Sequence, residues 1–359
     1  MSYPSILRLL VAGGMVLLAS AQRPADPLER VTGQASATDP VGRAGALDLL
    51  QRARTQYNLR SARRAYDLKV TFTVRSDGQT EHDGVWSMED VFDPRLGLRW
   101  TAKSSDGYSI TRIVHGNTVF GDDSTAYVPL RLHEARAALY DPMPSLESMN
   151  RSALRTATVV DGGAAVTCML LSDSSSRLGT ESGRRWDESE ECIDPTTGLL
   201  QSHSPVPGRS YTYDYSKGVA FSGRTLPGRI TVNEGGHAVS VITVESLTNP
   251  ASVDPVLFQP SESMRAKGQP VVLGGGQKLS RTITGEPVSA AAPGDTVCVF
   301  GLVTAGGQLV EAHSLQPANA QSAAAIEAAK KLTFPNSAKP GQAPQQFFVF
   351  VIEKIPASM

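Results

Sequence analysis

Hydrophobic and polar residues alternate along most of this chain with the two-residue period of half-exposed β-strands. In the first such run, Leu68, Val70, Phe72 and Val74 alternate with polar residues, which predicts a strand with one buried face. Short strands divided by turns predict an antiparallel sheet, because parallel strands would need helical crossovers between them. Similar runs, most of them separated by Gly, Pro, Asp or Asn, follow at 84–92, 97–103, 109–114, 164–171, 199–203, 211–215, 229–233 and 239–247.

Two segments of the same region, 44–59 and 130–140, have apolar residues at the three- and four-residue spacing of an amphipathic helix. The second ends at Asp141-Pro142, because proline disfavours helical backbone in the residue before it. We therefore expect an α+β fold in which a curved antiparallel sheet, an open barrel, carries helices on one face.

The composition changes in the last third of the chain. Residues 265–294 are rich in Gly, Pro, Ala and Ser and include Gly274-Gly275-Gly276, which is typical of a flexible interdomain linker. Beyond it, strands at 295–304 and 308–315, a helix at 322–332 and a strand at 345–355 predict a small ββαβ domain. The expected order is a signal peptide at 1–21, a disordered leader at 22–43, an antiparallel β domain at 44–264, the linker, and a C-terminal domain at 295–356.

The N-terminus has the pattern of a secretory signal peptide. Arg8 precedes an apolar run at 9–18, and Ala19 and Ala21 supply the small residues of a cleavage site before Gln22. A retained membrane anchor is the alternative, but a span needs about 20 apolar residues, and this run is shorter. We expect the mature chain to be periplasmic or secreted.

The cysteines agree with export. Cys168 and Cys192 lie in two strand-like segments joined by a polar stretch, and we predict a disulfide between them. In an oxidising compartment it would stabilise the fold by about 3 kcal/mol; two buried thiols are the alternative. Cys298 lies among apolar residues and is expected to be an inert buried thiol.

Charge and motifs point away from catalysis and from nucleic acid. Lys and Arg number 34 and Asp and Glu number 35, so the net charge gives no field that would attract nucleic acid. His133-Glu134 lies on a predicted helix, but a zinc-protease motif needs a second His where Ala137 stands. The six histidines are scattered singly, which favours surface positions, and an acidic cluster at 187–191 lacks the spacing of a calcium loop. We expect no catalytic residue, no metal and no cofactor.

The element order and one closing phrase resemble a known fold. A helix containing Leu49-Leu50-Gln51-Arg52-Ala53, a long run of antiparallel strands, and the segment Asn249-Pro250 to Asp254-Pro255-Val256-Leu257-Phe258 are similar to the LolA/LolB-type lipoprotein-sorting fold over residues 44–264. The resemblance implies an unclosed β-barrel whose apolar concave face takes up acyl chains. The alternative is that side chains fill this cavity.

The C-terminal domain resembles a TonB C-terminal domain. The similarity is carried by Gly306-Gly307, the helix Ala324-Ala325-Ile326-Glu327-Ala328, the phrase Leu332-Thr333-Phe334-Pro335 and Gly341. The chain departs from the family where a bulky aromatic usually precedes this Phe, and it lacks the usual Pro-x-Tyr-Pro start. The resemblance implies that the domain recruits partner peptides by strand addition.

The final strand supplies the expected partner site. Its residues Phe347, Phe348, Val349, Phe350, Val351 and Ile352 are expected at a sheet edge, where unpaired backbone groups can take an added strand. Pairing of this edge within the domain or in a dimer is the alternative. We therefore expect a non-catalytic cell-envelope binding protein that contacts an envelope protein or peptide by β-augmentation. A periplasmic carrier of a lipid or other apolar ligand is the second hypothesis.

Overall fold

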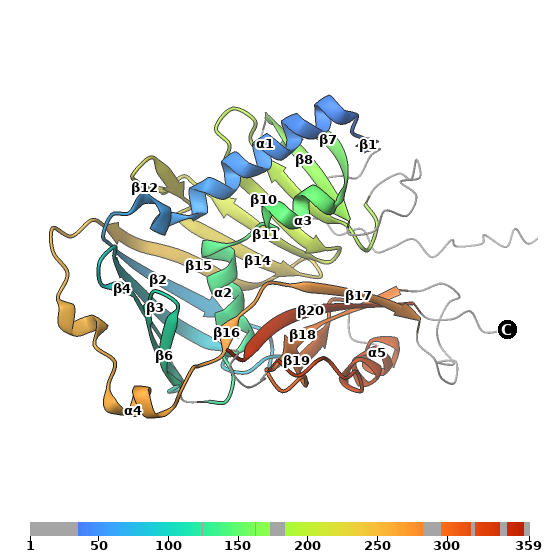
Figure 1. Cartoon of the computed structure of the whole chain (residues 1–359). Helices are drawn as coiled ribbons and strands as arrows, with labels where there is room; N and C mark the ends of the chain where they lie inside the picture. The colour runs from blue at the N-terminus through green and yellow to red at the C-terminus, as the bar shows by residue number, and fades with distance from the viewer. Residues whose placement is uncertain are drawn as a thin grey trace, which may run out of the picture.

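The main body of the protein is one open antiparallel sheet (Figure 1). The computed structural model describes residues 35–123, 125–161, 163–172, 184–282, 296–316, 320–337 and 343–354. Thirteen strands follow the order β1-β7-β8-β9-β10-β11-β14-β15-β2-β3-β4-β5-β6. Among the described strands, β1 and β6 are the two ends and do not pair with each other, so the sheet does not close into a barrel.

The strands of this sheet confirm the alternation that the sequence predicts, while β1, β6 and β7 lie where no strand is expected. A separate small hairpin consists of β12 (Val219–Phe221) and β13 (Arg224–Leu226). The bounds in the main sheet are β1 Ser36–Ala37, β2 Tyr66–Val74, β3 Gly84–Asp93, β4 Gly97–Ser104, β5 Ser109–His115, β6 Thr118–Asp123, β7 Ala153–Asp161, β8 Ala164–Ser172, β9 Ser189–Ile193, β10 Leu200–Val206, β11 Arg209–Asp214, β14 Arg229–Glu234 and β15 His237–Thr248.

Three helices cover the inner face of this sheet: α1 (Pro40–Tyr57), α2 (Leu130–Tyr140) and α3 (Leu146–Arg151). The α1 helix begins where Asp39 accepts a hydrogen bond from the Gly42 N–H at 2.7 Å, a standard N-cap. One apolar core joins the helices to the sheet, which confirms the expected curved sheet with helices on one face. Central members of the core are Leu50, Ala53, Leu132, Leu139, Phe72, Trp86 and Ile230.

The outer face of the sheet carries the predicted disulfide. Cys168 of β8 and Cys192 of β9 are direct cross-strand partners and are bonded to each other. Val166 and Leu170 pack around them in a small apolar cluster that is separate from the main core. The third cysteine, Cys298, is a fully buried thiol whose pKa is raised to about 12 by burial.

A second, smaller sheet follows, and its strand, strand, helix, strand order is as expected. It consists of β18 (Thr296–Val303), β19 (Leu309–Ser314), α5 (Ala320–Lys330) and β20 (Gln345–Lys354). The β18–β19 turn requires Gly307, whose φ is +81° and whose added Cβ would lie 2.3 Å from the Phe334 carbonyl oxygen. The resemblance of this part to a TonB C-terminal domain stays a prediction.

The structure corrects two predictions about this region. The first half of the expected linker contains α4 (Glu262–Ala266), β16 (Val272–Leu273) and β17 (Gln277–Thr282). Both strands pair with β20 in parallel, while β18 pairs with the opposite side of β20. The predicted edge strand is therefore an interior strand, and its backbone bonds on both sides are already used. Those residues are Phe347, Phe348, Val349, Phe350, Val351 and Ile352.

Strands β16 to β20 and α5 form what we call the C-terminal module. One face of its sheet, with Val299 and Val349, packs against Ala325 and Ala329 of α5. The opposite face packs against α2 and the main sheet, so α2 lies between the two sheets (Figure 1). The residues of this second contact are chiefly Leu130, Val206, Phe300, Leu302, Phe348 and Phe350.

Candidate binding site between the two modules

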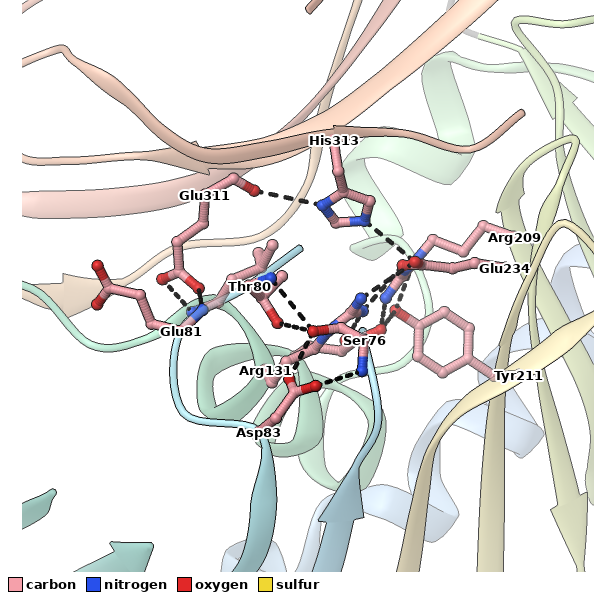
Figure 2. Close-up of polar contacts among 12 residues, drawn as sticks. Ser76, Thr80, Glu81, Asp83, Arg131, Arg209, Tyr211, Glu234, Glu311 and His313 are labelled. Atoms are coloured by element: carbon pink, nitrogen blue, oxygen red, sulfur yellow. Dashed lines mark hydrogen bonds and ion pairs between the residues drawn. The ribbon is translucent and has the colours of Figure 1, made fainter. Parts of the chain in front are cut away.

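A buried ionic cluster joins α2, the main sheet and the C-terminal module (Figure 2). Arg131 of α2 donates to both carboxylate oxygens of Glu234 on β14, at 2.8 and 3.0 Å, and to Glu134 at 2.9 Å. Arg209 of β11 contacts both carboxylates as well. These four side chains are at most 6% exposed, so two positive and two negative charges balance each other away from water. We call these four residues, with Glu311 and His313, the seam.

His313 of β19 brings the C-terminal module into this cluster. Its Nε2 lies 3.0 Å from Glu234 Oε2, and since a carboxylate only accepts, Nε2 carries the hydrogen of this bond. Burial lowers the pKa of His313 well below its ordinary value, and the neighbouring Arg131 and Arg209 lower it further. His313 is therefore a neutral hydrogen-bond donor to the cluster near neutral pH.

Glu311 of β19 caps the N-terminus of α2 from across the interface. One carboxylate oxygen accepts the backbone N–H of Leu130 at 2.9 Å, and the other accepts that of Glu81 at 3.0 Å (Figure 2). Pro129, at the N-cap position of α2, makes no side-chain capping bond, so the second module satisfies this helix end. Burial raises the pKa of Glu311 to about 7.

A third polar contact between the modules centres on His133 of α2. Its Nε2 lies 2.8 Å from the Gly274 carbonyl oxygen and its Nδ1 lies 3.1 Å from Gln346 Nε2. The Gln346 side-chain amide of β20 also accepts from the N–H of Val128 and donates to its C=O, each at 2.9 Å. The His133 ring packs on Phe348 with ring centroids 4.2 Å apart. Burial lowers the pKa of His133 to about 3. The module is therefore docked by specific bonds.

A cavity of about 650 Å³ lies beside this interface. Its walls come from the C-terminal half of α2, the α2–α3 connection, the inner face of the main sheet and the C-terminal module. Ten of the twenty lining residues are apolar or aromatic, two are glycines and eight are polar or charged, four of them serines. The lining comprises Ala137, Ala138, residues 141–145, Ser148, Ser152, Leu171, Ser189, His203, Pro205, Tyr211, residues 275–278, Phe348 and Phe350.

A smaller cavity of about 190 Å³ adjoins the first. The two share Ala137, Asp141 and Gly275, so α2 and the triple-glycine segment separate them. In the smaller cavity, Arg136 is bound by both carboxylate oxygens of Asp90, at 2.8 and 3.0 Å. The glycine segment that the sequence suggests as a hinge is instead part of a cavity wall between β16 and β17.

The structure brings only part of the predicted site together. Phe348 and Phe350 of the predicted edge strand line the larger cavity, whereas Val349 and Val351 face α5. The predicted cleavage residues Ala19, Ala21 and Gln22 lie outside the described residues, and so does most of the predicted leader. No helix in the described ranges is long and apolar enough to span a membrane. No group of three or more His, Cys, Asp or Glu in those ranges could hold a metal ion.

The expected surface position is wrong for two of the histidines. His133 and His313 are 2% and 3% exposed, because the C-terminal module covers the face of α2 that the main sheet leaves open. The acidic residue Glu134 is also buried, where it contacts Arg209 and Tyr211 of the main sheet. The sequence did hold one sign that a second surface contacts α2: three polar residues, Arg131 among them, lie within four positions of this helix.

Comparisons with known proteins give similarities of fold alone. No family model matches the chain, and no curated protein is significantly similar to it. A LolA superfamily protein from Nitrosomonas europaea is 9% identical with a TM-score of 0.36, covering 60% of this chain and 97% of that one. A lipoprotein-sorting protein domain from Vibrio parahaemolyticus is 7% identical with a TM-score of 0.34, covering 59% and 98%. The MucA/MucB complex of Pseudomonas aeruginosa is 13% identical with a TM-score of 0.27, covering 63% and 63%. TM-scores this low carry no argument about function.

Proposed function

We propose that this chain is an exported, non-catalytic binding protein that holds an apolar or amphipathic small molecule between its two modules. The observation that carries the proposal is the cavity of about 650 Å³, which falls within the roughly 300–1,000 Å³ of small-molecule sites. Its lining combines apolar and aromatic side chains with polar ones, as an amphipathic ligand requires, and it lies at the boundary of two modules, where ligand sites are common.

The strand pairing in the C-terminal module leaves no free edge at β20 for the competing hypothesis, in which a partner adds a strand there. Strand addition at β20 would need a free backbone edge, and β20 is paired on one side by β18 and on the other by β16 and β17. The apolar side chains of its inner face, Phe348 and Phe350, are available to the cavity instead. A ligand carrier therefore fits this module better than a reader of partner strands.

Binding without catalysis is the second part of the proposal. His203 and Ser189 both line the cavity, and His203 pairs with Glu191 at 2.7 Å. A hydrolase of the serine type would also need a hydroxyl bonded to that histidine. Among the described residues, no hydrogen bond joins His203 to a serine. Export is supported by the predicted signal peptide at 1–21 and by the Cys168–Cys192 disulfide, which suits an oxidising compartment such as the periplasm.

A fluorescent probe tests the cavity directly. N-phenyl-1-naphthylamine, a neutral apolar dye, should bind the purified mature chain saturably and gain fluorescence. Ala137→Phe should weaken this binding at least fivefold, because Ala137 lines both cavities and is only half-buried, so the larger ring fills empty space.

The matched control is Ala220→Phe, which places the same ring on an exposed position of β12 and should leave dye binding unchanged. Thermal unfolding of both variants establishes that each is folded. The proposal is wrong if the wild-type chain shows no saturable binding, or if a folded Ala137→Phe chain binds the dye as well as the wild type does.

A further inference from the structure

One histidine of the larger cavity offers a ring nitrogen to a ligand. The charged side chains of the same lining are Asp141 and Lys278, and Lys278 Nζ donates to the Asp187 carbonyl oxygen at 3.2 Å. His203 of β10 lines the cavity, and its ring stacks on Tyr211 of β11 with centroids 5.4 Å apart. Its Nδ1 lies 2.7 Å from Glu191 Oε2 on β9, its direct cross-strand partner. The Glu191 side chain is 0% exposed, whereas that of His203 is 12% exposed. The pair therefore joins a buried carboxylate to an imidazole that a ligand can reach.

This pairing determines which nitrogen is offered to a ligand. A carboxylate accepts and never donates, so Nδ1 of His203 carries the hydrogen shared with Glu191. In the described part of the chain, Nε2 has no hydrogen-bond partner. A carboxylic acid can give its proton to Nε2: the O–H bond breaks, the N–H bond forms, and an imidazolium then stands between two carboxylates. For a ligand that arrives as the carboxylate, the same proton comes from solvent.

The opposite wall of the cavity suits an apolar chain. Phe348 and Phe350 project from β20, and Ala137, Pro142 and Pro144 lie on or after α2. A volume of about 650 Å³ holds roughly twenty water-sized groups at about 30 Å³ each. That is room for one hydrocarbon chain with its head group, and too little for a lipid with several chains.

We propose that the ligand is a single-chain amphiphile with an acidic head, whose carboxylate binds His203 Nε2 and whose chain packs against Phe348 and Phe350. This assignment rests on the proposed function, since it names the ligand class of the same cavity. Glu191 is a positioning residue: it holds the ring and balances the charge that His203 gains on binding. An alcohol or an ester of the same chain cannot form this ion pair.

Three competitors of equal chain length isolate the head group: dodecanoic acid, 1-dodecanol and methyl dodecanoate, each displacing N-phenyl-1-naphthylamine. On the wild-type chain, dodecanoic acid should compete at least tenfold better than the methyl ester, the effect of one hydrogen bond to a charged group.

His203→Asn is the decisive variant, because its amide nitrogen replaces Nδ1 as the donor to Glu191 while nothing replaces Nε2. Dodecanoic acid should then lose at least tenfold in affinity, while the dye and the methyl ester bind within twofold of wild type. His115→Asn, at an exposed position of β5, is the matched control and should change none of these values.

The possible outcomes test the acidic head group separately from the ligand cavity. If acid and ester compete equally on the wild-type chain, or if a folded His203→Asn chain keeps the preference, the acidic head is wrong although dye binding still supports the cavity. If the dye does not bind the wild-type chain at all, both the ligand class and the proposed function are wrong. Should His203→Asn fail to fold, the wild-type comparison of acid with ester decides alone.

Discussion

Glu311 makes the docking of the C-terminal module dependent on pH. Burial raises its pKa from the ordinary 4.5 to about 7, so the folded chain keeps a proton that the unfolded chain releases between these values. The resulting stabilisation is fully present below pH 4.5 and is lost as the pH rises through about 7. At about 1.36 kcal/mol per unit of pKa, this group contributes a change of about 3 kcal/mol across that window.

Two buried histidines of the same interface act in the opposite direction. The pKa values of His133 and His313 are lowered by burial from 6.5, so the unfolded chain binds protons that the folded chain does not. Their stabilisation is present above pH 6.5 and is lost as the pH falls. The wild-type curve alone therefore mixes the two effects, and a variant that removes only the carboxylate is needed.

Glu311→Gln isolates the carboxylate, since an amide cannot titrate and still accepts one of the two backbone N–H bonds. The quantity to measure is the free energy of unfolding in urea of both chains, from about pH 5 to about pH 8. The wild-type value minus the variant value should be larger at pH 5 than at pH 8, by up to about 3 kcal/mol. Glu327→Gln, at an exposed position of α5, is the matched surface control. A constant difference for Glu311→Gln would refute the reasoning, because the carboxylate would then titrate as it does in water.

Two further predictions test the seam and the β18–β19 turn. Arg131→Met leaves two buried carboxylates with one arginine and should lower the free energy of unfolding by about 3–5 kcal/mol, measured in urea; a loss under about 1 kcal/mol would mean that water reaches the cluster. Gly307 and Gly78 both have positive φ, +81° and +75°, but an added Cβ would lie 2.3 Å from the Phe334 carbonyl oxygen only at Gly307. Gly78→Ala should therefore cost about 1–2 kcal/mol, and Gly307→Ala clearly more; equal losses would contradict this contact.

Local periodicity was enough to predict most of the individual strands of the main sheet, though not β1, β6 and β7. The strand expected from Tyr66 onward is β2, Tyr66–Val74, and the helix expected at 130–140 is α2. Each is specified within its own segment, by alternation in the strand and by a three-to-four spacing in the helix. The disulfide was predictable for a similar reason, because Cys168 and Cys192 lie on neighbouring strands that follow each other along the chain.

Pairing between distant segments could not be predicted in this way. β17 joins β20 across about 70 residues of sequence, and its polar, glycine-flanked sequence is typical of a linker when it is considered alone. One signal of the interior position was present in β20 itself. Its two faces are both apolar, with Phe348 and Phe350 on one and Val349 and Val351 on the other, and a strand of that kind is covered on both sides.

The same pairing supports the proposal that the C-terminal module forms part of the binding site instead of reading partner strands on its own. A fragment that starts at residue 295 lacks β16 and β17, so β20 would expose an apolar edge that the whole chain covers. Such an edge pairs readily with other strands. Proteins captured by that fragment would therefore bind because β20 has lost its partners β16 and β17. The seam supports this conclusion, because Glu311 and His313 are satisfied only when they reach α2 and Glu234. We therefore expect ligand binding to require the two modules together.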